Sequence, residues 1–503
     1  MQRTFSGGVT VRTERDCFGR EVRKSVRSGG IEKGAYRYQW GIANRLLSKE
    51  NELTGTVTRY DYDRFDFLIR QETMQGSETD VIYRTPDFVG NLFETPDKKD
   101  RKYGAGGKLL EDPDCFYHYD DEGNLIFREF KQLQETGVRF DRKRMEKERG
   151  IHFLATGTGW LYEWSSNGML KKVIRPDGRP VEFRYDALGR RTAKQYFGKV
   201  TRWVWDGNVP IHEWSYKVTD MQSDEKESTS SKEPTEDITT WVFEADTFIP
   251  TAKIRDGKQY SIVSDYLGTP IQIYDEQGIK IWDCTLEIYG KVLAVDKGTK
   301  FDCPFRFQGM YADSELDGLY YNHFRWYDSN TGNYLSQDPI GLAGSNPTLY
   351  TYVFDTNSQV DIWGLLILYH AGDLQGNIDL TKGRQNLDFN PTGKGGFYAT
   401  TDLSQAQKWA ERKGGSITVF DIPDEKLAAL KTKTFDAPTD EWADFVTKGR
   451  AGTLSHDFDA VSGPMLANPH GKKPKATGSQ FAIFSDEAAS LFDEHKVGTI
   501  DCH

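Results

Sequence analysis

Strand-like stretches that end in a tight turn recur through the first two thirds of this chain, and this repetition constrains the fold more than any other feature. In several turns an aspartate follows an aromatic residue and a glycine comes three residues later, as in Tyr185-Asp186-Ala187-Leu188-Gly189. Glycine readily takes the positive φ that such turns need, and the aromatic side chain can pack across neighbouring strands. The turns recur at intervals of roughly 20 to 45 residues, so we expect hairpins stacked side by side in one large antiparallel sheet. Related patterns lie in the segments 117–125, 162–170, 184–190, 265–268 and 273–278.

Bulk composition narrows the class of protein. At 503 residues the chain is too long for one ordinary core, so two or more units are expected. Aromatic residues at 13% and 48 glycines fit a β-rich, turn-rich protein. The net charge of -11 argues against a general nucleic-acid binder, although an enzyme that touches RNA transiently remains compatible with it. The five scattered cysteines include no CxxC pair and suit neither a disulfide framework nor a zinc site, which favours reduced thiols in a protein made in the cytosol.

The hydropathy pattern predicts no membrane span. No apolar run reaches about 18 residues, and the region after Met1 lacks the apolar core of a signal peptide. If the protein leaves its cell, we expect a route that reads no cleavable signal.

The composition and residue pattern of the sequence change after the segment 361–365. Upstream the chain is aromatic and punctuated by glycine, whereas downstream it mixes helix and strand patterns. We therefore predict a repetitive β domain over 1–365 and a compact α+β domain over 366–503. The segment 217–237 is rich in Ser, Glu and Lys without an apolar anchor, so we interpret it as a disordered or exposed loop between strands, with a domain linker as the alternative.

These motifs resemble the Rhs/YD-repeat family. The resemblance is specific along 304–365, where the segments 304–309, 318–328, 336–342 and 361–365 look like the Rhs-associated core terminus. It implies a mostly β fold in which the repeats wind into a hollow β-cocoon around a C-terminal toxin. The core is shorter than is usual in that family, so we expect a partial or open shell, or one completed by a partner.

The resemblance also implies self-cleavage. Family members cut themselves just after the core with paired aspartates, and the matching residues are Asp338 and Asp361. Two carboxyls held close cannot both ionise, so one can stay protonated as an acid while the other activates water. By analogy the cut falls between Leu365 and Leu366. The alternative is that both aspartates only cap glycine turns.

The C-terminal segment reads as a small α+β domain. Short strands are expected at 366–372, 395–401, 416–422 and 480–484. Helices are expected after Asp402, around 441–446, and from the cap at Ser485 to about His495. The segment has no phosphate loop, no HxE…PCxxC deaminase signature and no paired-histidine metal pattern, so we predict no metal site.

The order of these motifs resembles the ADP-ribosyltransferase fold, and NAD is then the implied substrate. Tyr369 and His370 match the first-strand motif, in which the histidine binds a ribose hydroxyl. Gly372 leaves room for NAD beside the backbone. Tyr398 matches the aromatic that stacks on nicotinamide, and Thr400 lies on the same strand face and supports the pocket. The alternatives are a strand-end histidine and a core tyrosine.

The implied catalytic residues are Gln480, His370 and Tyr398, with Glu441 as a less favoured candidate. Gln480 occupies the position of the family's catalytic Glu, where a side-chain oxygen holds the ribose 2′-hydroxyl as nicotinamide leaves. Glutamine can orient the substrate but carries no charge, so an acid such as Glu441 or Asp444 is the alternative contributor. Gln480 can also be read as a polar residue that begins a strand.

Together these features predict a toxin of the Rhs type, an effector of a secretion system in interbacterial competition. It would be made in the bacterial cytoplasm and would modify a protein or RNA in the cytoplasm of a target cell. The expected partners are a cognate immunity protein and a secretion apparatus or adaptor. A nuclease or NAD glycohydrolase in the same shell is one alternative. A non-enzymatic YD-repeat surface protein is another, and the change of texture at residue 365 argues against it.

Overall fold

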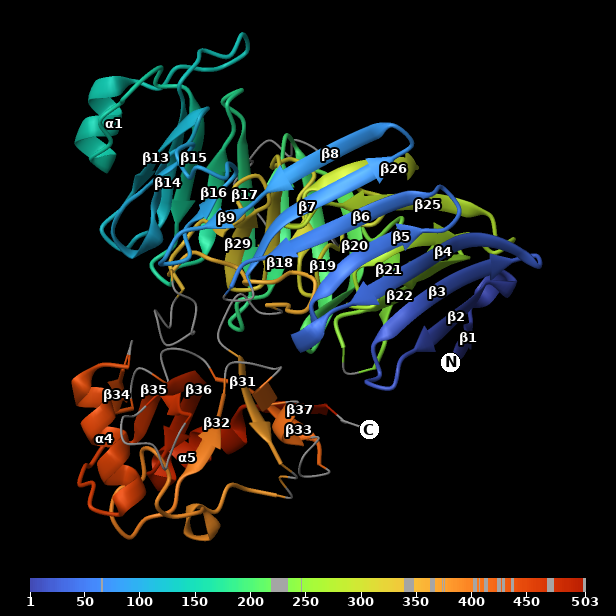
Figure 1. Ribbon diagram of the computed structural model, residues 1–503. Coiled ribbons are helices and arrows are strands. Elements are labelled where there is room, and N and C mark those ends of the chain that lie inside the picture. The colour runs from blue at the N-terminus through green and yellow to red at the C-terminus, as the bar shows by residue number, and fades with distance from the viewer. Residues whose placement is uncertain are drawn as a thin grey trace, which may run out of the picture. The chain divides into compact units, whose positions relative to one another are not determined.

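The computed structural model divides the chain into two compact units (Figure 1). The first comprises Met1–Gln337 and Thr348–Gly364, and the second comprises Asp338–Pro347 and Leu365–His503. The structure describes residues 1–64, 67–218, 234–245, 247–338, 348–361, 367–372, 374, 376–400, 405–406, 408–410, 415–422, 427, 430–435, 438–467 and 475–500. Residues 219–233 of the predicted loop lie outside these ranges.

The first unit is built from two large antiparallel meanders. In each of them every strand pairs with its neighbours in sequence. One sheet has eight strands: β1 (Gln2–Thr4), β2 (Thr10–Arg15), β3 (Glu21–Ser28), β4 (Ile31–Trp40), β5 (Leu46–Asn51), β6 (Thr56–Tyr62), β7 (Leu68–Gln75) and β8 (Glu78–Tyr83). The other has sixteen: β11 (Lys102–Tyr103), β12 (Leu109–Glu111), β13 (Cys115–Tyr119), β14 (Leu125–Phe130), β15 (Gly159–Trp164), β16 (Leu170–Ile174), β17 (Pro180–Tyr185), β18 (Arg191–Tyr196), β19 (Lys199–Asp206), β20 (Val209–Lys217), β21 (Thr239–Phe243), β22 (Pro250–Arg255), β23 (Lys258–Ser264), β24 (Pro270–Tyr274), β25 (Lys280–Leu286) and β26 (Val292–Lys297).

The mostly β prediction is confirmed, but the expectation of one large sheet is wrong. Between β8 and β11 the chain forms only the two-stranded pair β9 (Thr85–Pro86) and β10 (Leu92–Phe93). This stretch carries prolines, glycines and acids rather than alternating apolar residues, so it cannot continue the ladder. The other elements that the structure describes in this unit are the four-stranded sheet β27 (Tyr311–Ala312), β28 (Leu319–Asn322), β29 (Arg325–Asp328) and β30 (Asn333–Tyr334), the helix α1 (Arg142–Arg149), and 3₁₀ helices at Ser6–Gly8, Ile42–Asn44 and Ala105–Gly107.

The Asp-x-x-Gly turns join the strands as the sequence predicts. At Asp186 the carboxylate accepts hydrogen bonds from the backbone N–H groups of Leu188 and Arg190, both at 2.9 Å. Gly189 closes the turn with a φ of +76°, and its N–H donates to the Asp186 carbonyl. The turns at Asp265 and Asp275 repeat the same contacts. The aspartate therefore fixes the turn, and the glycine supplies its conformation.

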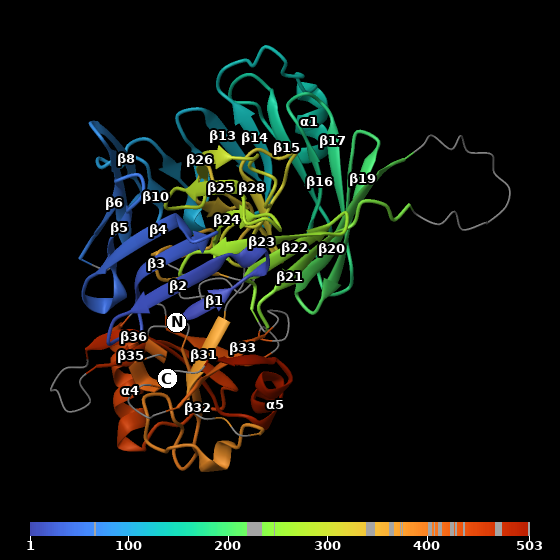
Figure 2. The same ribbon diagram turned by 90° about the vertical axis from the view of Figure 1, so that its right-hand side faces the viewer.

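Aromatic residues fill the interior of the first unit. One core gathers residues from β12 to β25 with residues of 303–335, including Trp203, Trp282 and Trp326. A second core lies between the eight-stranded sheet and β23–β24, which run beside each other in Figure 2. In this core Val26 and Tyr36 pack with Tyr274. The two meanders thus share apolar contacts inside one unit.

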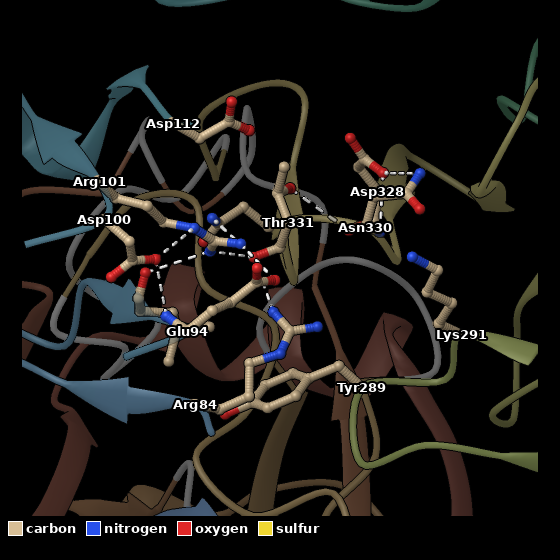
Figure 3. Close-up of polar contacts among 12 residues, drawn as sticks. Arg84, Glu94, Asp100, Arg101, Asp112, Tyr289, Lys291, Asp328, Asn330 and Thr331 are labelled. Carbon is tan, nitrogen blue, oxygen red and sulfur yellow. Dashed lines mark hydrogen bonds and ion pairs between the residues drawn. The ribbon is translucent and has the colours of Figure 1, made fainter. Parts of the chain in front are cut away.

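Two buried arginines attach the connection between the meanders to the segment 318–334 (Figure 3). Arg84 and Arg101 each donate to the carbonyl of Thr331 at 2.8 Å. The Arg84 guanidinium lies 3.7 Å from the ring centroid of Tyr289, and Arg101 pairs with Glu94 at 2.7 Å. These contacts compensate the burial of two charges, which would otherwise be costly.

The second unit has two small sheets. The three-stranded sheet has the order β31 (Ile367–Ala371), β33 (Ile417–Asp421), β37 (Lys496–Ile500). The four-stranded sheet has the order β32 (Phe397–Ala399), β36 (Ala476–Ile483), β35 (Ala460–Leu466), β34 (Thr432–Thr434), in which only β34 and β35 run parallel. A 3₁₀ helix spans Leu380–Lys382. β31, β32, β33 and β36 confirm the four strands expected from the sequence, whereas β34, β35 and β37 were not predicted.

Two described helices cover the four-stranded sheet of the second unit. Trp442 and Val446 of α4 (Asp440–Ala451) pack with one set of side chains, and Ala488 and Phe492 of α5 (Asp486–Glu494) pack with another. The predicted cap of α5 is confirmed, because the Ser485 side chain accepts a hydrogen bond from the Ala488 N–H. The cap predicted at Asp402 lies outside the described residues.

Candidate functional site

Three strands that are far apart in the sequence meet in the second unit. β32 pairs with β36, which places Tyr398 opposite Ala482. β31 joins them through a bridge between Tyr369 and Thr400, whose backbone groups exchange hydrogen bonds of 2.7 and 2.8 Å. The fold therefore brings together the segments that carry all of the predicted NAD-site residues except Glu441.

His370 is oriented by its neighbours on β32. Its Nδ1 lies 2.7 Å from the carbonyl oxygen of Tyr398, and its ring stacks on Phe397 with centroids 4.2 Å apart. A carbonyl can only accept, so Nδ1 carries the proton and, in the neutral ring, Nε2 is a hydrogen-bond acceptor. The strand contacts thus fix the tautomer of His370.

Gly372 lies next to the acceptor nitrogen of His370. A Cβ atom added at residue 372 would come within 2.9 Å of His370 Nε2. Real Cβ contacts of that length are essentially absent from proteins, so any other residue would crowd the ring. The glycine therefore keeps a side chain away from Nε2. Room for NAD beside the backbone stays a prediction.

Tyr398 points to the opposite side of β32. Its hydroxyl donates to Asn390 Oδ1 at 2.6 Å and accepts from the Phe389 N–H at 3.1 Å. Burial raises the pKa of Tyr398 well above its usual value, so the phenol stays protonated at neutral pH. The Tyr398 ring packs edge-on against the ring of Phe484. Its role in stacking on nicotinamide stays a prediction, and the ring that lies against His370 is that of Phe397.

Gln480 is buried on the same side as Tyr398. Only 5% of the residue is exposed, and Nε2 donates to Asp388 Oδ2 at 2.8 Å and to the Pro464 carbonyl at 3.4 Å. The segment 388–390 thus contacts both Gln480 and Tyr398. Thr400 is buried beside them, with its hydroxyl 3.4 Å from that of Ser479.

The alternative acids lie on the surface of α4. Glu441 pairs with Lys433 at 2.7 Å, and 68% of its side chain is exposed. Asp444 pairs with Lys448 at 2.7 Å on the same helix. The structure therefore does not bring Glu441 or Asp444 into the buried network around Gln480.

The first unit holds one residue of the predicted self-cleavage pair in a cradle of hydrogen bonds. The Asp361 carboxylate accepts from Arg325 at 3.0 Å and from the Tyr334 hydroxyl at 2.7 Å. Its backbone N–H donates to the Tyr352 hydroxyl, and its carbonyl accepts from Asn322 Nδ2 at 2.8 Å. The Arg325 guanidinium favours the charged form of this carboxyl.

Of the other three residues of the predicted cleavage site, the structure describes Asp338. Asp338 is buried. Leu365 and Leu366 lie outside the described residues. An acid pair formed by Asp338 and Asp361 therefore stays a prediction.

Sequence reasoning missed the residues that contact the predicted site from 388–397. Asp388 and Asn390 hold Gln480 and Tyr398, and Phe397 supports His370. Their signal in the sequence is weak, because an acid and an amide that alternate with Leu387 and Phe389 also describe an ordinary surface strand. Only the pairing of β31, β32 and β36 reveals their roles.

Within the described part of the chain, no group of three or more His, Cys, Asp or Glu side chains could hold a metal ion. No described helix is long and apolar enough to span a membrane.

Two family models match the chain. The first, described as Teneurin YD-shell, matches residues 88–359, which is more than half of the chain. The second, described as Protein of unknown function (DUF3990), matches residues 366–472.

Known proteins resemble the chain over most of its length. Double-stranded DNA deaminase toxin A of Burkholderia cenocepacia is 29% identical over 437 residues, covering 81% of this chain and 28% of that protein. Probable deoxyribonuclease RhsA of Dickeya dadantii is 26% identical over 385 residues, covering 71% of this chain and 24% of that protein. The crystal structure of TcdB2-TccC3 is similar with a TM-score of 0.34 and 18% identity, covering 71% of this chain and 21% of that one. The chain thus spans about a quarter of the length of these curated relatives.

Proposed function

The chain belongs to the teneurin YD-shell family, and on that basis we propose that it is an Rhs-type toxin with a YD-repeat shell over 1–365 and an ADP-ribosyltransferase over 366–503. The word toxin in the name of its Burkholderia relative supports the class. Delivery would involve a secretion apparatus or adaptor, and the producing cell would need a cognate immunity protein. The toxin would be made in the bacterial cytoplasm and act in the cytoplasm of the target cell.

The observation that carries the transferase proposal is the fixed tautomer of His370 beside Gly372. With no side chain at residue 372 to crowd it, a neutral Nε2 can accept a hydrogen bond from a ribose hydroxyl. In the reaction the bond between the ribose C1′ and the nicotinamide nitrogen breaks, and its electron pair leaves with nicotinamide. An acceptor oxygen or nitrogen then bonds to C1′ and loses a proton.

Gln480, Tyr398 and Thr400 have supporting roles in this proposal. The Gln480 amide oxygen would hold the ribose 2′-hydroxyl while positive charge develops at C1′. Tyr398 stays a neutral phenol in its buried hydrogen bonds, and Phe397 keeps the His370 ring in place. Tyr369 and Thr400 join β31 to the other two strands.

The self-cleavage proposal assigns different roles to the two aspartates. Asp361, ion-paired with Arg325, is the carboxylate that activates water, and Asp338 is the protonated acid. The peptide bond between Leu365 and Leu366 would be hydrolysed, which frees the C-terminal domain from the shell.

The second candidate is a toxin that acts on DNA in the same shell. It is favoured by the names of the relatives, which describe a DNA deaminase and a probable deoxyribonuclease. Both candidates share the delivery shell and differ only in the reaction of 366–503.

The deciding experiment incubates the full-length chain with labelled NAD and a bacterial lysate, and then separates protein from RNA. Label on either fraction supports the transferase, and His370→Asn should reduce it on the order of 10² to 10³-fold. His152→Asn, an exposed change in the first unit, is the matched control and should leave the signal unchanged. Free ADP-ribose without labelled macromolecule would indicate a glycohydrolase. NAD that stays intact while added DNA is cut or deaminated would establish the second candidate.

A further inference from the structure

Asp388 is the most completely buried acid among those of the second unit whose side chains the structure describes, with 1% of the residue exposed. One carboxylate oxygen accepts from Nε of Arg450 on α4. The other accepts from the Leu466 N–H at 2.7 Å and from Gln480 Nε2 at 2.8 Å. Three donors on three different elements therefore hold one carboxylate in place.

The backbone of Asp388 lies in close contact with α4. A Cβ atom added at Gly449 of α4 would come within 2.2 Å of the Asp388 carbonyl oxygen. The helix can approach this closely only because residue 449 is glycine. The close packing of α4 and the three hydrogen bonds to the carboxylate place Asp388 beside Gln480.

The chemistry around Gln480 leaves one orientation for its amide. Both atoms that face the amide, Asp388 Oδ2 and the Pro464 carbonyl oxygen, are acceptors. An amide turned the other way would place its oxygen against a carboxylate, so the nitrogen must face Asp388. The carbonyl oxygen then occupies the other branch of the side chain.

We propose that Asp388 is a positioning residue that locks the Gln480 amide with its nitrogen inward and its oxygen directed at the substrate. The proposal rests on the transferase function assigned above. It explains why glutamine stands where the family has glutamate, since the negative charge already resides on Asp388, next to the amide. The negative charge of Asp388 polarises the Gln480 amide and thereby acts on the substrate through the amide oxygen.

A glutamate at position 480 would therefore harm this site. Gln480→Glu replaces a donor with a carboxylate oxygen about 2.8 Å from Asp388 Oδ2, where two like charges repel. The pKa of the new carboxyl would rise above its ordinary value. A group whose pKa is raised by folding stabilises the protein below its unfolded pKa, and this contribution is lost as the pH rises through the folded pKa.

The test compares thermal unfolding of the second unit in the full-length chain at pH 5 and pH 8. Gln480→Glu should melt close to wild type at pH 5, where the new carboxyl is protonated and donates to Asp388. At pH 8 its melting temperature should fall on the order of 5 °C relative to wild type. Adding Asp388→Asn removes the opposing charge, so the double variant should show a much smaller difference between the two pH values. Equal penalties at both pH values, or a pH response that survives Asp388→Asn, would overturn the proposal.

NAD turnover provides the second readout. Asp388→Asn allows the Gln480 amide to adopt the flipped orientation, so kcat should fall on the order of tenfold with KM little changed. Gln480→Glu should also lose turnover at pH 8, and a gain would overturn the proposal. If wild type consumes no NAD, the transferase function fails, while the pH response of Gln480→Glu still decides whether Asp388 holds residue 480.

Discussion

Substitutions of the residues that bond to Asp361 should destabilise the first unit by amounts that depend on the charge of the Asp361 carboxylate. Tyr334→Phe removes the hydroxyl that donates to the Asp361 carboxylate at 2.7 Å and accepts from Asn322 at 2.8 Å. A hydrogen bond to a charged group contributes about 1.5–3 kcal/mol and a neutral one about 1 kcal/mol. The free energy of unfolding should therefore fall by about 2–4 kcal/mol.

Tyr327→Phe is the matched control in the same four-stranded sheet. Tyr327 is also fully buried, but its hydroxyl donates to a neutral partner, the Tyr289 carbonyl, at 2.9 Å. Its loss should cost about 1 kcal/mol. Arg325→Met should cost the most, about 3–5 kcal/mol, because it leaves the Asp361 carboxylate buried without its cation.

The assay is equilibrium urea unfolding of the full-length variants, followed by tryptophan fluorescence, with the first unit's transition compared between variants. The loss of stability should be largest for Arg325→Met, smaller for Tyr334→Phe and smallest for Tyr327→Phe. Equal losses for the two tyrosine variants would show that Asp361 carries no charge in the cradle. An Arg325→Met variant more stable than Tyr334→Phe would contradict the ion pair.

Three further outcomes are expected. Asp338→Asn should leave one band where wild type gives two fragments, and a wild-type chain at full mass in intact mass spectrometry would rule out self-cleavage. Phe397→Ala should lower NAD turnover on the order of tenfold by freeing the His370 ring, whereas unchanged turnover would remove Phe397 from the site. Glu129 accepts from three backbone N–H groups of 154–157 and from His118, and these bonds outweigh burial and lower its pKa. The ionised Glu129 carboxylate therefore stabilises the fold fully above its ordinary pKa, and this contribution is lost as the pH falls through its lower pKa in the folded protein. Glu129→Gln should destabilise the first unit at pH 7 and much less at pH 3. The midpoints of urea unfolding measure both effects.

The sequence predicted the local units well because each carries its own physical cause. The turn at Asp186 needs only its own carboxylate and Gly189, and the cap at Ser485 needs only the next turn of helix. The division into two meanders was not predicted, since it depends on a stretch between β8 and β11 that breaks the ladder. Hairpin signals describe neighbours and do not reveal where a sheet ends.

The candidate site was predicted less completely because its contacts join distant segments. Phe397 and Tyr398 are neighbours in sequence, and the ring that stacks on His370 is that of Phe397. Which of the two faces His370 follows from the pairing of β31 with Thr400, and a single strand pattern contains no such information. Asp388 was missed for the same reason, since its partners come from α4, β35 and β36.

The tyrosines of the segment 318–334 do more than fill the core, because their hydroxyls also bond to backbone carbonyls. The hydroxyls of Tyr320 and Tyr321 donate to the carbonyls of Gly290 and Gly189, which are turn glycines of the sixteen-stranded sheet. Turn carbonyls at strand ends have no partner in the ladder, and in a buried position each would be costly. A phenol supplies both the apolar ring for the core and the donor for the carbonyl. Phenylalanine would fill the same volume and leave the turns unsatisfied, so the tyrosines both fill the interior and attach the segment that leads to Asp361 to the sheet around it.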